Sequence, residues 1–397
     1  MVEFRIFALG SLFLTLLTIG LTRSEGIDIS NRYVIKIKNS ADAQQVDRYI
    51  KSKLDQHNRA RDINHSARNE LKIKISMDDY FAYAGSLSNS LVKEFRKNSD
   101  IEYIEPEQIF TASAIQQSPP SWGLARIAQR KPLNGTQVYN YPDSAGEGVD
   151  VYIIDTGVSV KHVDFEGRAT LPISFVDGEA TEDLNGHGTH VSGTIGGKTY
   201  GVAKKVRLIG VKVLGGDGSG TTSGVISGID WVANQAKSTG RKSVANMSLG
   251  GGNSDALNDA ITAAVKAGVS FIVAAGNESQ DACNVSPANG ASAFAVGATT
   301  ITDAEADFSN FGKCVKIFAP GVDITSAWIG SETATNKISG TSMASPHVAG
   351  IAALYLSQKS IQTPSDLYSA LVSHATKDVI TGLSKDTLNL LAYNSVE

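Results

Sequence analysis

The stretch GVDVYIID (Gly148–Asp155) decides which fold class we expect for most of this chain. It is an apolar run of strand length that ends in a carboxylate and leads into a turn containing glycine. Similar runs recur as VRLIGVKVL at 206–214, SVANMSL at 243–249 and GVSFIVAAGN at 268–277. Strands that are apolar throughout are typical of parallel sheets, because both of their faces are covered.

Helical patterns separate these runs and complete the predicted architecture. TSGVISGIDWVANQAK at 222–237 and SDALNDAITAAVKAG at 254–268 have the spacing of amphipathic helices. Strands that alternate with helices predict an α/β fold with a doubly wound, mainly parallel sheet. In such sheets ligands bind beyond the carboxyl ends of the strands, where Asp155, Ser248 and Asn277 stand in this sequence.

The composition favours a protein with a large core and two or more domains. The chain has 397 residues, of which 42% are hydrophobic and 38 are glycine, and its formal net charge is -4. A chain of this length exceeds the common size of a single domain. The nearly balanced charge gives no sign of the basic surface that nucleic-acid binding requires.

Residues 1–24 are typical of a secretory signal peptide. Arg5 precedes an apolar stretch at 6–21, and the small residues Thr22 and Ser24 suit the flanks of a signal-peptidase site. The stretch is shorter than the roughly 20 residues of a membrane-spanning helix, and an N-terminal membrane anchor stays as the alternative. We therefore expect a secreted, extracellular protein that does not associate with membranes after signal removal.

The segment after the signal peptide predicts a small, separate α+β domain of the ferredoxin-like kind. Its strands and helices are expected to alternate, with one additional strand near the middle. The predicted strands are 32–39, 70–75, 81–85 and 101–110, and the predicted helices are 40–56 and 88–98. The stretch TASAIQQSPPS at 111–121 contains two prolines without periodicity and predicts a linker. We place this domain at 25–114 and the larger one at 115–397.

Ser342 is the candidate nucleophile of the larger domain. It lies in GTSMASPHVAG (Gly340–Gly350), where a glycine-flanked turn leads into an alanine-rich helical pattern that contains Pro346. An exposed turn of this kind presents a hydroxyl group clear of its surroundings. A serine nucleophile also needs a base, a group that orients the base and donors for an oxyanion.

His187 is the preferred base among the 7 histidines. It stands between two glycines at the start of a helix in NGHGTHVSGTIGG (185–197), where glycine allows close approach of another segment. His190, one turn further on, is interpreted as a packing or hydrogen-bonding residue. His347 is interpreted as a packing residue behind the serine, and His162 is expected in a polar loop.

Asp155 and Asn277 are the candidates for the two remaining roles. A carboxylate at the end of a buried strand is costly without a partner, and Asp155 could orient the imidazole of the base. Its alternative role is a helix cap. The side-chain amide of Asn277, together with the backbone N–H of Ser342, could donate to a tetrahedral oxyanion. Its alternative role is that of a turn asparagine after a strand.

The motifs IIDTGV, NGHGTHVSGTIGG and GTSMASPHVAG, in the order Asp, His, Ser, resemble the subtilisin superfamily of serine proteases, most closely its proteinase K-like branch. Chymotrypsin-like and α/β-hydrolase families have a different order. The resemblance implies that Asp155, His187 and Ser342 are the catalytic triad and Asn277 the oxyanion residue. The segments FAYAGSLSNSLVKEF and IEYIEPEQ are similar to the I9-type inhibitory pro-domains of that superfamily.

The same resemblance implies a groove that clamps an extended peptide between two glycine-rich edges. A pocket beside the groove would hold the side chain before the scissile bond. Because the implied pocket residues are small and uncharged, we expect broad specificity with an apolar or aromatic preference. The implied residues are Gly218, Ser219 and Gly220 on one edge, Ser248, Leu249 and Gly250 on the other, and Ala274, Ala275 and Gly276 in the pocket.

The resemblance also bears on the two cysteines and on metal binding. It implies a disulfide between Cys283 and Cys314. Relatives with a calcium site have an acidic residue where this chain has Lys316, in the sequence CVK. A cation there would repel calcium, so we assign no metal site and expect no cofactor, with calcium dependence left open.

Taken together, these motifs predict a secreted serine endopeptidase that is synthesised as a self-cleaving zymogen. We expect cleavage between Ala114 and Ile115, after which the pro-domain stays bound as an inhibitor, having served as an intramolecular chaperone. The expected partners are therefore protein and peptide substrates and the chain's own pro-domain, and the mature enzyme is expected to be a monomer. The alternative from another class is a catalytically silent binding protein with the same fold.

Overall fold

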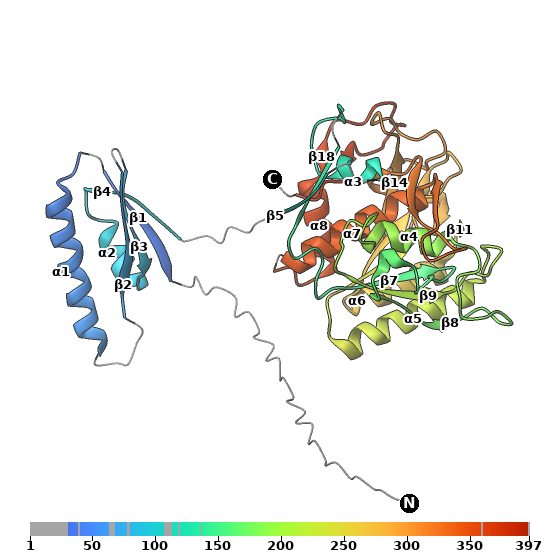
Figure 1. The fold of residues 1–397 in the computed structure, drawn as a ribbon, viewed down its shortest axis with the longest axis horizontal. Coiled ribbons are helices and arrows are strands. Elements are labelled where there is room, and N and C mark those ends of the chain that lie inside the picture. Colours follow the sequence, from blue (N-terminus) through green and yellow to red (C-terminus); the bar gives the residue numbers. More distant parts are fainter. Residues whose placement is uncertain are drawn as a thin grey trace, which may run out of the picture. The chain divides into compact units, whose positions relative to one another are not determined.

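The computed structural model describes residues 31–38, 40–62, 68–77, 80–106, 113–117, 120–135, 137–358 and 360–395. The predicted signal peptide at 1–24 lies outside the described residues. Contacts within the chain define two units, Met1–Phe110 and Thr111–Glu397. Each of them is described by itself below (Figure 1).

In its described residues, the first unit is a four-stranded antiparallel sheet with two helices. Alternating side chains of the strands, such as Ile35 and Ile37, pack with Val46 of the first helix and Phe95 of the second, because each element has one apolar face. The elements occur in the predicted order. The strands in sheet order are β2 (Glu70–Met77), β3 (Tyr80–Ser86), β1 (Arg32–Ile37) and β4 (Ile101–Pro106), and the helices are α1 (Ala43–Asp62) and α2 (Asn89–Phe95).

The second unit is built on a nine-stranded sheet within the described part of the chain. All neighbouring strands in it are parallel except the edge pair β18–β19, which confirms the predicted mainly parallel sheet. In sheet order the strands are β18 (Thr376–Lys377), β19 (Leu390–Leu391), β15 (Val315–Pro320), β14 (Phe294–Thr299), β12 (Ser270–Ala274), β10 (Ser243–Met247), β7 (Asp150–Asp155), β9 (Arg207–Lys212) and β8 (Ala169–Ser174).

Helices cover both faces of this sheet, as the apolar runs predicted (Figure 1). Val151 and Ile153 of β7 belong to the core on one face, and Tyr152 and Ile154 belong to the core on the other. Successive side chains of a strand point to opposite faces, so a strand between two layers must be apolar at every position. The first core includes α3 (Trp122–Ile127), α4 (His187–Gly196), α7 (Thr341–Gln358) and α8 (Pro364–His374), and the second includes α5 (Thr222–Thr239) and α6 (Asp255–Lys266).

The strand order changes direction at β7. From this strand the chain adds β8 and β9 on one side and β10, β12, β14 and β15 on the other. In open parallel sheets, ligands bind outside the carboxyl ends of the strands at such a point. Asp155 is the last residue of β7 and therefore stands where the fold favours a site.

Short elements complete the second unit. The strand β5 (Ser113–Gln117) pairs with β6 (Val138–Pro142), so the predicted domain boundary between Ala114 and Ile115 falls inside β5. The remaining elements are the strand pairs β11 (Gly251–Gly252) with β13 (Val285–Ser286) and β16 (Ile324–Ala327) with β17 (Thr335–Ile338), and the 3-10 helices η1 (Val163–Phe165) and η2 (Ala282–Asn284).

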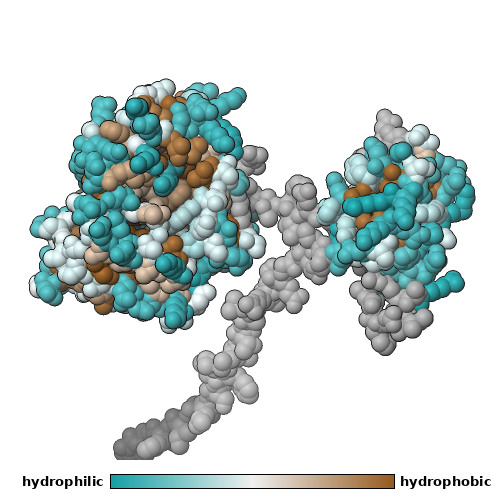
Figure 2. Space-filling view, turned by 180° about the vertical axis from the view of Figure 1, so that it is seen from behind, coloured by the Kyte–Doolittle hydropathy of each residue, from teal (hydrophilic) through white to brown (hydrophobic). Residues whose placement is uncertain are grey.

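The surface of both units is largely hydrophilic on the face shown in Figure 2, with hydrophobic patches on the larger unit. The large hydrophobic side chains lie mainly in the cores described above. Within the described ranges, no helix is both long and apolar enough to cross a membrane.

Candidate active site

Asp155 and His187 contact each other at the carboxyl end of the sheet. Asp155 is fully buried, and His187 is the first residue of α4. His187 Nδ1 lies 2.8 Å from Asp155 Oδ1. Because the carboxylate only accepts, Nδ1 carries the proton and donates it, which leaves Nε2 of the neutral imidazole free to act as a base.

The surroundings of His187 favour its protonated form. Burial of the imidazole by itself would lower its pKa. The charge of Asp155, its hydrogen bond and the charge of Asp183 outweigh this effect, and the pKa of His187 is raised above its ordinary value. The imidazolium that forms when a base takes a proton is therefore stabilised here.

Asp183 is a buried carboxylate that ties the start of α4 to the end of β7. Its Oδ1 accepts from Thr156 Oγ1 at 2.9 Å and from the N–H groups of Asn185 and Gly186 at 3.1 and 2.9 Å. Its Oδ2 accepts from the N–H and the hydroxyl of Thr189 at 2.9 and 2.5 Å. Sequence reasoning missed this residue, although an aspartate just before a helix start is a common capping signal.

The glycines on either side of His187 are required by sterics. Gly186 has φ 102°, and a Cβ there would lie 2.6 Å from the ring of Trp328. A Cβ on Gly188 would lie 2.1 Å from the carbonyl oxygen of Gly157. These close approaches explain the glycine-flanked histidine in the sequence.

Ser342 is the second residue of α7 and is half-buried, not in the exposed turn that we expected, and it exchanges two hydrogen bonds with Ser248. Ser342 Oγ donates to the Ser248 carbonyl at 3.2 Å, and Ser248 Oγ donates to the Ser342 carbonyl at 2.9 Å. Pro346 lacks the N–H that would normally bond the Ser342 carbonyl one turn earlier. The hydroxyl of Ser248 therefore satisfies the acceptor that the proline leaves open.

No hydrogen bond joins Ser342 Oγ to His187 among the hydrogen bonds of the described residues. His187 and Ser248 nevertheless line the same cavity, and Ser342 is bonded to Ser248. In enzymes without substrate, catalytic hydrogen bonds are often long and shorten when substrate binds.

Three further histidines are bonded to backbone carbonyls inside the fold. His347 Nδ1 donates to Met343 at 2.8 Å, and His190 Nε2 donates to Ile324 at 2.9 Å. Burial lowers the pKa of each to about 4, so both are neutral near pH 7. His162 is also buried, although it was expected in a polar loop, and its Nε2 donates to a carbonyl at 2.8 Å.

Asn277 follows β12 and is held by the residue before the serine. Its Oδ1 accepts from the N–H and the hydroxyl of Thr341 at 2.8 and 2.9 Å. These bonds fix which side of the amide faces Thr341 and leave Nδ2 as the donor for another acceptor. An amide donor beside a serine nucleophile suits an oxyanion.

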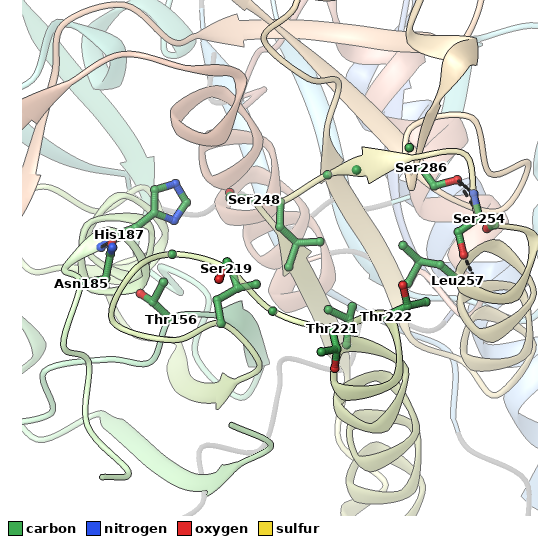
Figure 3. A pocket seen from close by; sticks show the side chains of 18 residues that line it. Thr156, Asn185, His187, Ser219, Thr221, Thr222, Ser248, Ser254, Leu257 and Ser286 are labelled. Carbon is green, nitrogen blue, oxygen red and sulfur yellow. Dashed lines mark hydrogen bonds between the residues drawn. The ribbon is translucent and has the colours of Figure 1, made fainter. Parts of the chain in front are cut away.

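A cavity of about 500 Å³ contains His187 and both predicted substrate edges. Figure 3 shows His187 at one end and Leu257 with Ser286 at the other, with Ser219 and Ser248 between them. The predicted residues that line it are Gly218, Ser219 and Gly220 on one side and Ser248, Leu249 and Gly250 on the other.

A second cavity of about 300 Å³ contains Ala274, Ala275 and Gly276, the predicted pocket residues. Gly250 lines both cavities, so the pocket adjoins the cleft. Glu278 also lines this pocket and adds a carboxylate that sequence reasoning did not assign to it. The only signal available was its position after Asn277.

The predicted disulfide is confirmed. Cys283 of η2 and Cys314, which precedes β15, are joined with an S–S distance of 2.11 Å and a Cα–Cα distance of 5.3 Å. In the described residues, no group of three or more His, Cys, Asp or Glu side chains is arranged to hold a metal ion.

The predicted cleavage residues lie apart from these side chains. Ala114 and Ile115 are part of β5, where they pair with Tyr141 and Asn140 of β6. Neither of these β6 residues lines the cleft or the pocket.

Comparison with known proteins gives consistent matches. Residues 146–389 match the model of the subtilase family, peptidase S8. The chain is 49% identical over 333 residues to "Subtilisin-like serine protease Pen ch 18" of Penicillium rubens, covering 79% of this chain and 67% of that protein. It is 44% identical over 385 residues to "Subtilase-type proteinase psp3" of Schizosaccharomyces pombe, covering 93% and 83% of the two chains.

A solved structure agrees with these matches. The chain is 51% identical to a protein described as "a cold adapted subtilisin-like serine proteinase", with a TM-score of 0.65 over 70% of this chain and 98% of that one. A family match over more than half of the sequence, on a fold whose sheet brings aspartate and histidine together, leaves one assignment. We conclude that this chain belongs to the subtilase family and is a serine endopeptidase.

Proposed function

We propose that the enzyme hydrolyses peptide bonds through an acyl-enzyme on Ser342. The observation that carries this mechanism is the 2.8 Å contact between His187 Nδ1 and Asp155 Oδ1 beside the cleft. Ser342 Oγ attacks the carbonyl carbon while its proton passes to His187 Nε2. The proton then moves to the leaving amine as the C–N bond breaks, and a water molecule, activated by the same imidazole, hydrolyses the ester.

Asn277 Nδ2 and the backbone N–H of Ser342 donate to the oxyanion of the tetrahedral intermediate. This role is supported by the bonds from Thr341 that fix the carbonyl side of the Asn277 amide. A donor of this kind contributes about 2.7–4 kcal/mol to lowering the barrier.

The substrate binds as an extended strand between the edges at 218–220 and 248–250. Backbone hydrogen bonds supply affinity, and pockets for alternate side chains supply selectivity. Ala274, Ala275 and Gly276 favour apolar or aromatic side chains before the scissile bond, and broad specificity follows from the small size of these residues, while Asn310 donates a hydrogen bond to the Glu278 carboxylate of the same pocket.

The enzyme is secreted as a monomeric zymogen that cleaves itself between Ala114 and Ile115. Residues 25–114 assist folding and then inhibit the enzyme. An extended segment can occupy the cleft as a substrate does. The peptide bond between Ala114 and Ile115 lies in β5, which pairs with β6, and β6 does not line the cleft. Because this bond must enter the cleft to be cleaved, β5 either pairs with β6 only after cleavage or separates from it before cleavage.

A labelled fluorophosphonate tests the nucleophile. We expect labelling at Ser342 in the mature protein and none in Ser342→Ala, which should also lose peptide hydrolysis. Ser331→Ala, a change at an exposed loop serine, is the matched control and should label normally. Normal hydrolysis by Ser342→Ala would disprove the assignment, and an unlabelled, inactive mature protein would support the silent binding protein instead.

A further inference from the structure

Asn310 uses its entire side-chain amide to hold the segment 275–280. It is fully buried in the connection between β14 and β15. Its Nδ2 donates to the Ala275 carbonyl at 3.0 Å and to Glu278 Oε2 at 2.7 Å. Its Oδ1 accepts from the N–H groups of Glu278 and Gln280 at 3.1 and 3.0 Å. Its own N–H donates to the Gly276 carbonyl at 3.0 Å.

The segment held in this way carries Asn277, and no helix or strand stabilises it. It begins after β12 ends at Ala274, and the side chain of Asn277 is exposed. The residues on either side of Asn277, Gly276 and Glu278, are both bonded to Asn310. The backbone position of Asn277 therefore depends on Asn310, while Thr341 sets the orientation of its amide.

The fit between Asn310 and this segment is close. Gly276 has φ 103°, which favours glycine. A Cβ at this position would lie 2.2 Å from Asn310 Nδ2 and 2.6 Å from Glu278 Oε2. The backbone thus passes directly against the asparagine amide, with no room for adjustment on that side.

Building on the proposed oxyanion role of Asn277, we propose that Asn310 is a positioning residue for catalysis. It does not touch the substrate and acts through the backbone on both sides of Asn277. Asparagine suits this task because one short planar group offers two donor hydrogens and an acceptor oxygen. An aspartate would offer only acceptors, and an alanine would leave three backbone groups of the segment without their partner.

The kinetic test uses Asn310→Ala and Asn277→Ala singly and together. An oxyanion donor acts in the transition state, so loss of its position lowers kcat and leaves KM nearly unchanged. We expect Asn310→Ala to lower kcat about tenfold or more, while removal of the donor itself costs about 10²–10³. If Asn310 works only through Asn277, the double variant is no slower than Asn277→Ala alone.

The outcomes separate this inference from the proposed function. Equal losses for Asn310→Ala in both backgrounds would overturn the positioning role and leave the oxyanion role intact. An unchanged kcat in Asn310→Ala would do the same. A normal kcat in Asn277→Ala would instead remove the oxyanion role and the inference with it.

Asn389→Ala is the matched control for the loss of an asparagine that braces a loop. Asn389 also bonds through both ends of its amide, accepting from the Ile380 N–H and donating to the Ile380 carbonyl, each at 2.9 Å. It lines neither the cleft nor the pocket. We expect its loss to lower the thermal midpoint without changing kcat.

If Asn310→Ala does not fold, a second pair of variants, in which the donor and acceptor of the Asn310–Glu278 contact are exchanged, tests the inference. Asn310→Asp places two carboxylates where the amide and Glu278 now meet at 2.7 Å, and it should lower kcat at least tenfold. Adding Glu278→Gln restores a donor and an acceptor at this contact with their directions reversed, while the Ala275 carbonyl still lacks its donor, so the recovery is partial. We expect kcat to recover relative to Asn310→Asp alone, with Glu278→Gln measured separately. No recovery would count against the contact as the positioning device.

Discussion

At the scale of single residues, two carboxylates act on His187 in different ways. Asp155 bonds to the imidazole directly and determines which nitrogen carries the proton. Asp183 does not bond to the imidazole, but it caps the start of α4 and adds a second negative charge nearby. The pair outweighs the burial that would otherwise keep the imidazole neutral.

The pH dependence of kcat/KM should report this balance. His187 must be neutral to accept a proton, so activity falls as pH drops through its raised pKa. We expect the midpoint of the acid limb above the ordinary histidine value of about 6.5. In Asp183→Asn one negative charge is lost, so the pKa of His187 falls and the acid limb of the residual activity moves to lower pH.

The control for this shift is Asp259→Asn, which makes the same charge change on the exposed side of α6. Initial rates of peptide hydrolysis over roughly pH 5–9, the range in which a histidine base titrates, give the acid limb of both variants and of the unchanged enzyme. A limb that stays in place in Asp183→Asn, or moves equally in the control, would contradict the stated influence of Asp183.

At the scale of elements, buried polar pairs join segments that the sheet does not connect. The short helix α3 is held through Arg126, whose side chain is fully buried. Arg126 Nε donates to Asp303 Oδ1 at 2.6 Å, and Arg126 Nη2 donates to Asp303 Oδ2 at 3.1 Å. Arg126 Nη1 donates to the Gln129 carbonyl at 2.6 Å. The guanidinium fork fits a carboxylate with two parallel bonds.

Arg126→Met should lower the free energy of unfolding by about 3–5 kcal/mol, because Asp303 would remain buried without its partner. Denaturant unfolding in a Ser342→Ala background, where self-digestion is absent, measures the change. Removing both charges in Arg126→Met/Asp303→Ala should recover part of the loss. A single-variant loss below about 1 kcal/mol would contradict the importance of the pair.

The disulfide is a second link between elements. Cys283 and Cys314 are 31 positions apart, and the loop they close contains β14 and Asn310. In the chain-entropy model a loop of this size stabilises the fold by about 3–4 kcal/mol. Cys283→Ala/Cys314→Ala should therefore lower the thermal midpoint without changing which peptides are cut. An unchanged midpoint, or two free thiols in the purified enzyme, would contradict this expectation.

At the scale of the whole molecule, the chain divides after Phe110 into two units with separate cores. The strand β5 belongs to the second unit and contains the bond proposed for cleavage. Activation therefore concerns the backbone of β5 as well as the active site, since a peptide bond must lie in the cleft to be hydrolysed.

Expression of the Ser342→Ala chain tests self-cleavage. We expect it to accumulate uncut, beginning after the signal peptide, whereas the unchanged chain is cut at or near Ala114–Ile115. Mass spectrometry of both products determines the new ends. If the variant is cut at the same place in a protease-free system, another enzyme performs the processing.

The sequence by itself determined the fold class, the element order of the first unit and the identities of the principal site candidates. It did not predict β5, because Ser113–Gln117 lies in the stretch 111–121 that was interpreted as a linker. Apolar runs such as 148–155 predict buried strands because periodicity is a property of adjacent residues. Glycines beside His187 likewise mark special backbone positions locally. The motifs around Asp155, His187 and Ser342 can therefore be recognised in the sequence alone.

Only the tertiary structure decided which distant groups support those candidates. Ser248 and Ser342 are 94 positions apart, and Asn310 and Glu278 are 32 apart. Nothing near Asn310 in the sequence indicates its role, because each of its partners comes from another connection of the sheet. The carboxylate of Glu278 in the pocket was missed for the same physical reason, whereas the capping bonds of Asp183 are local and could have been read from the sequence. A hydrogen bond depends on position in space, and folding alone brings these groups together.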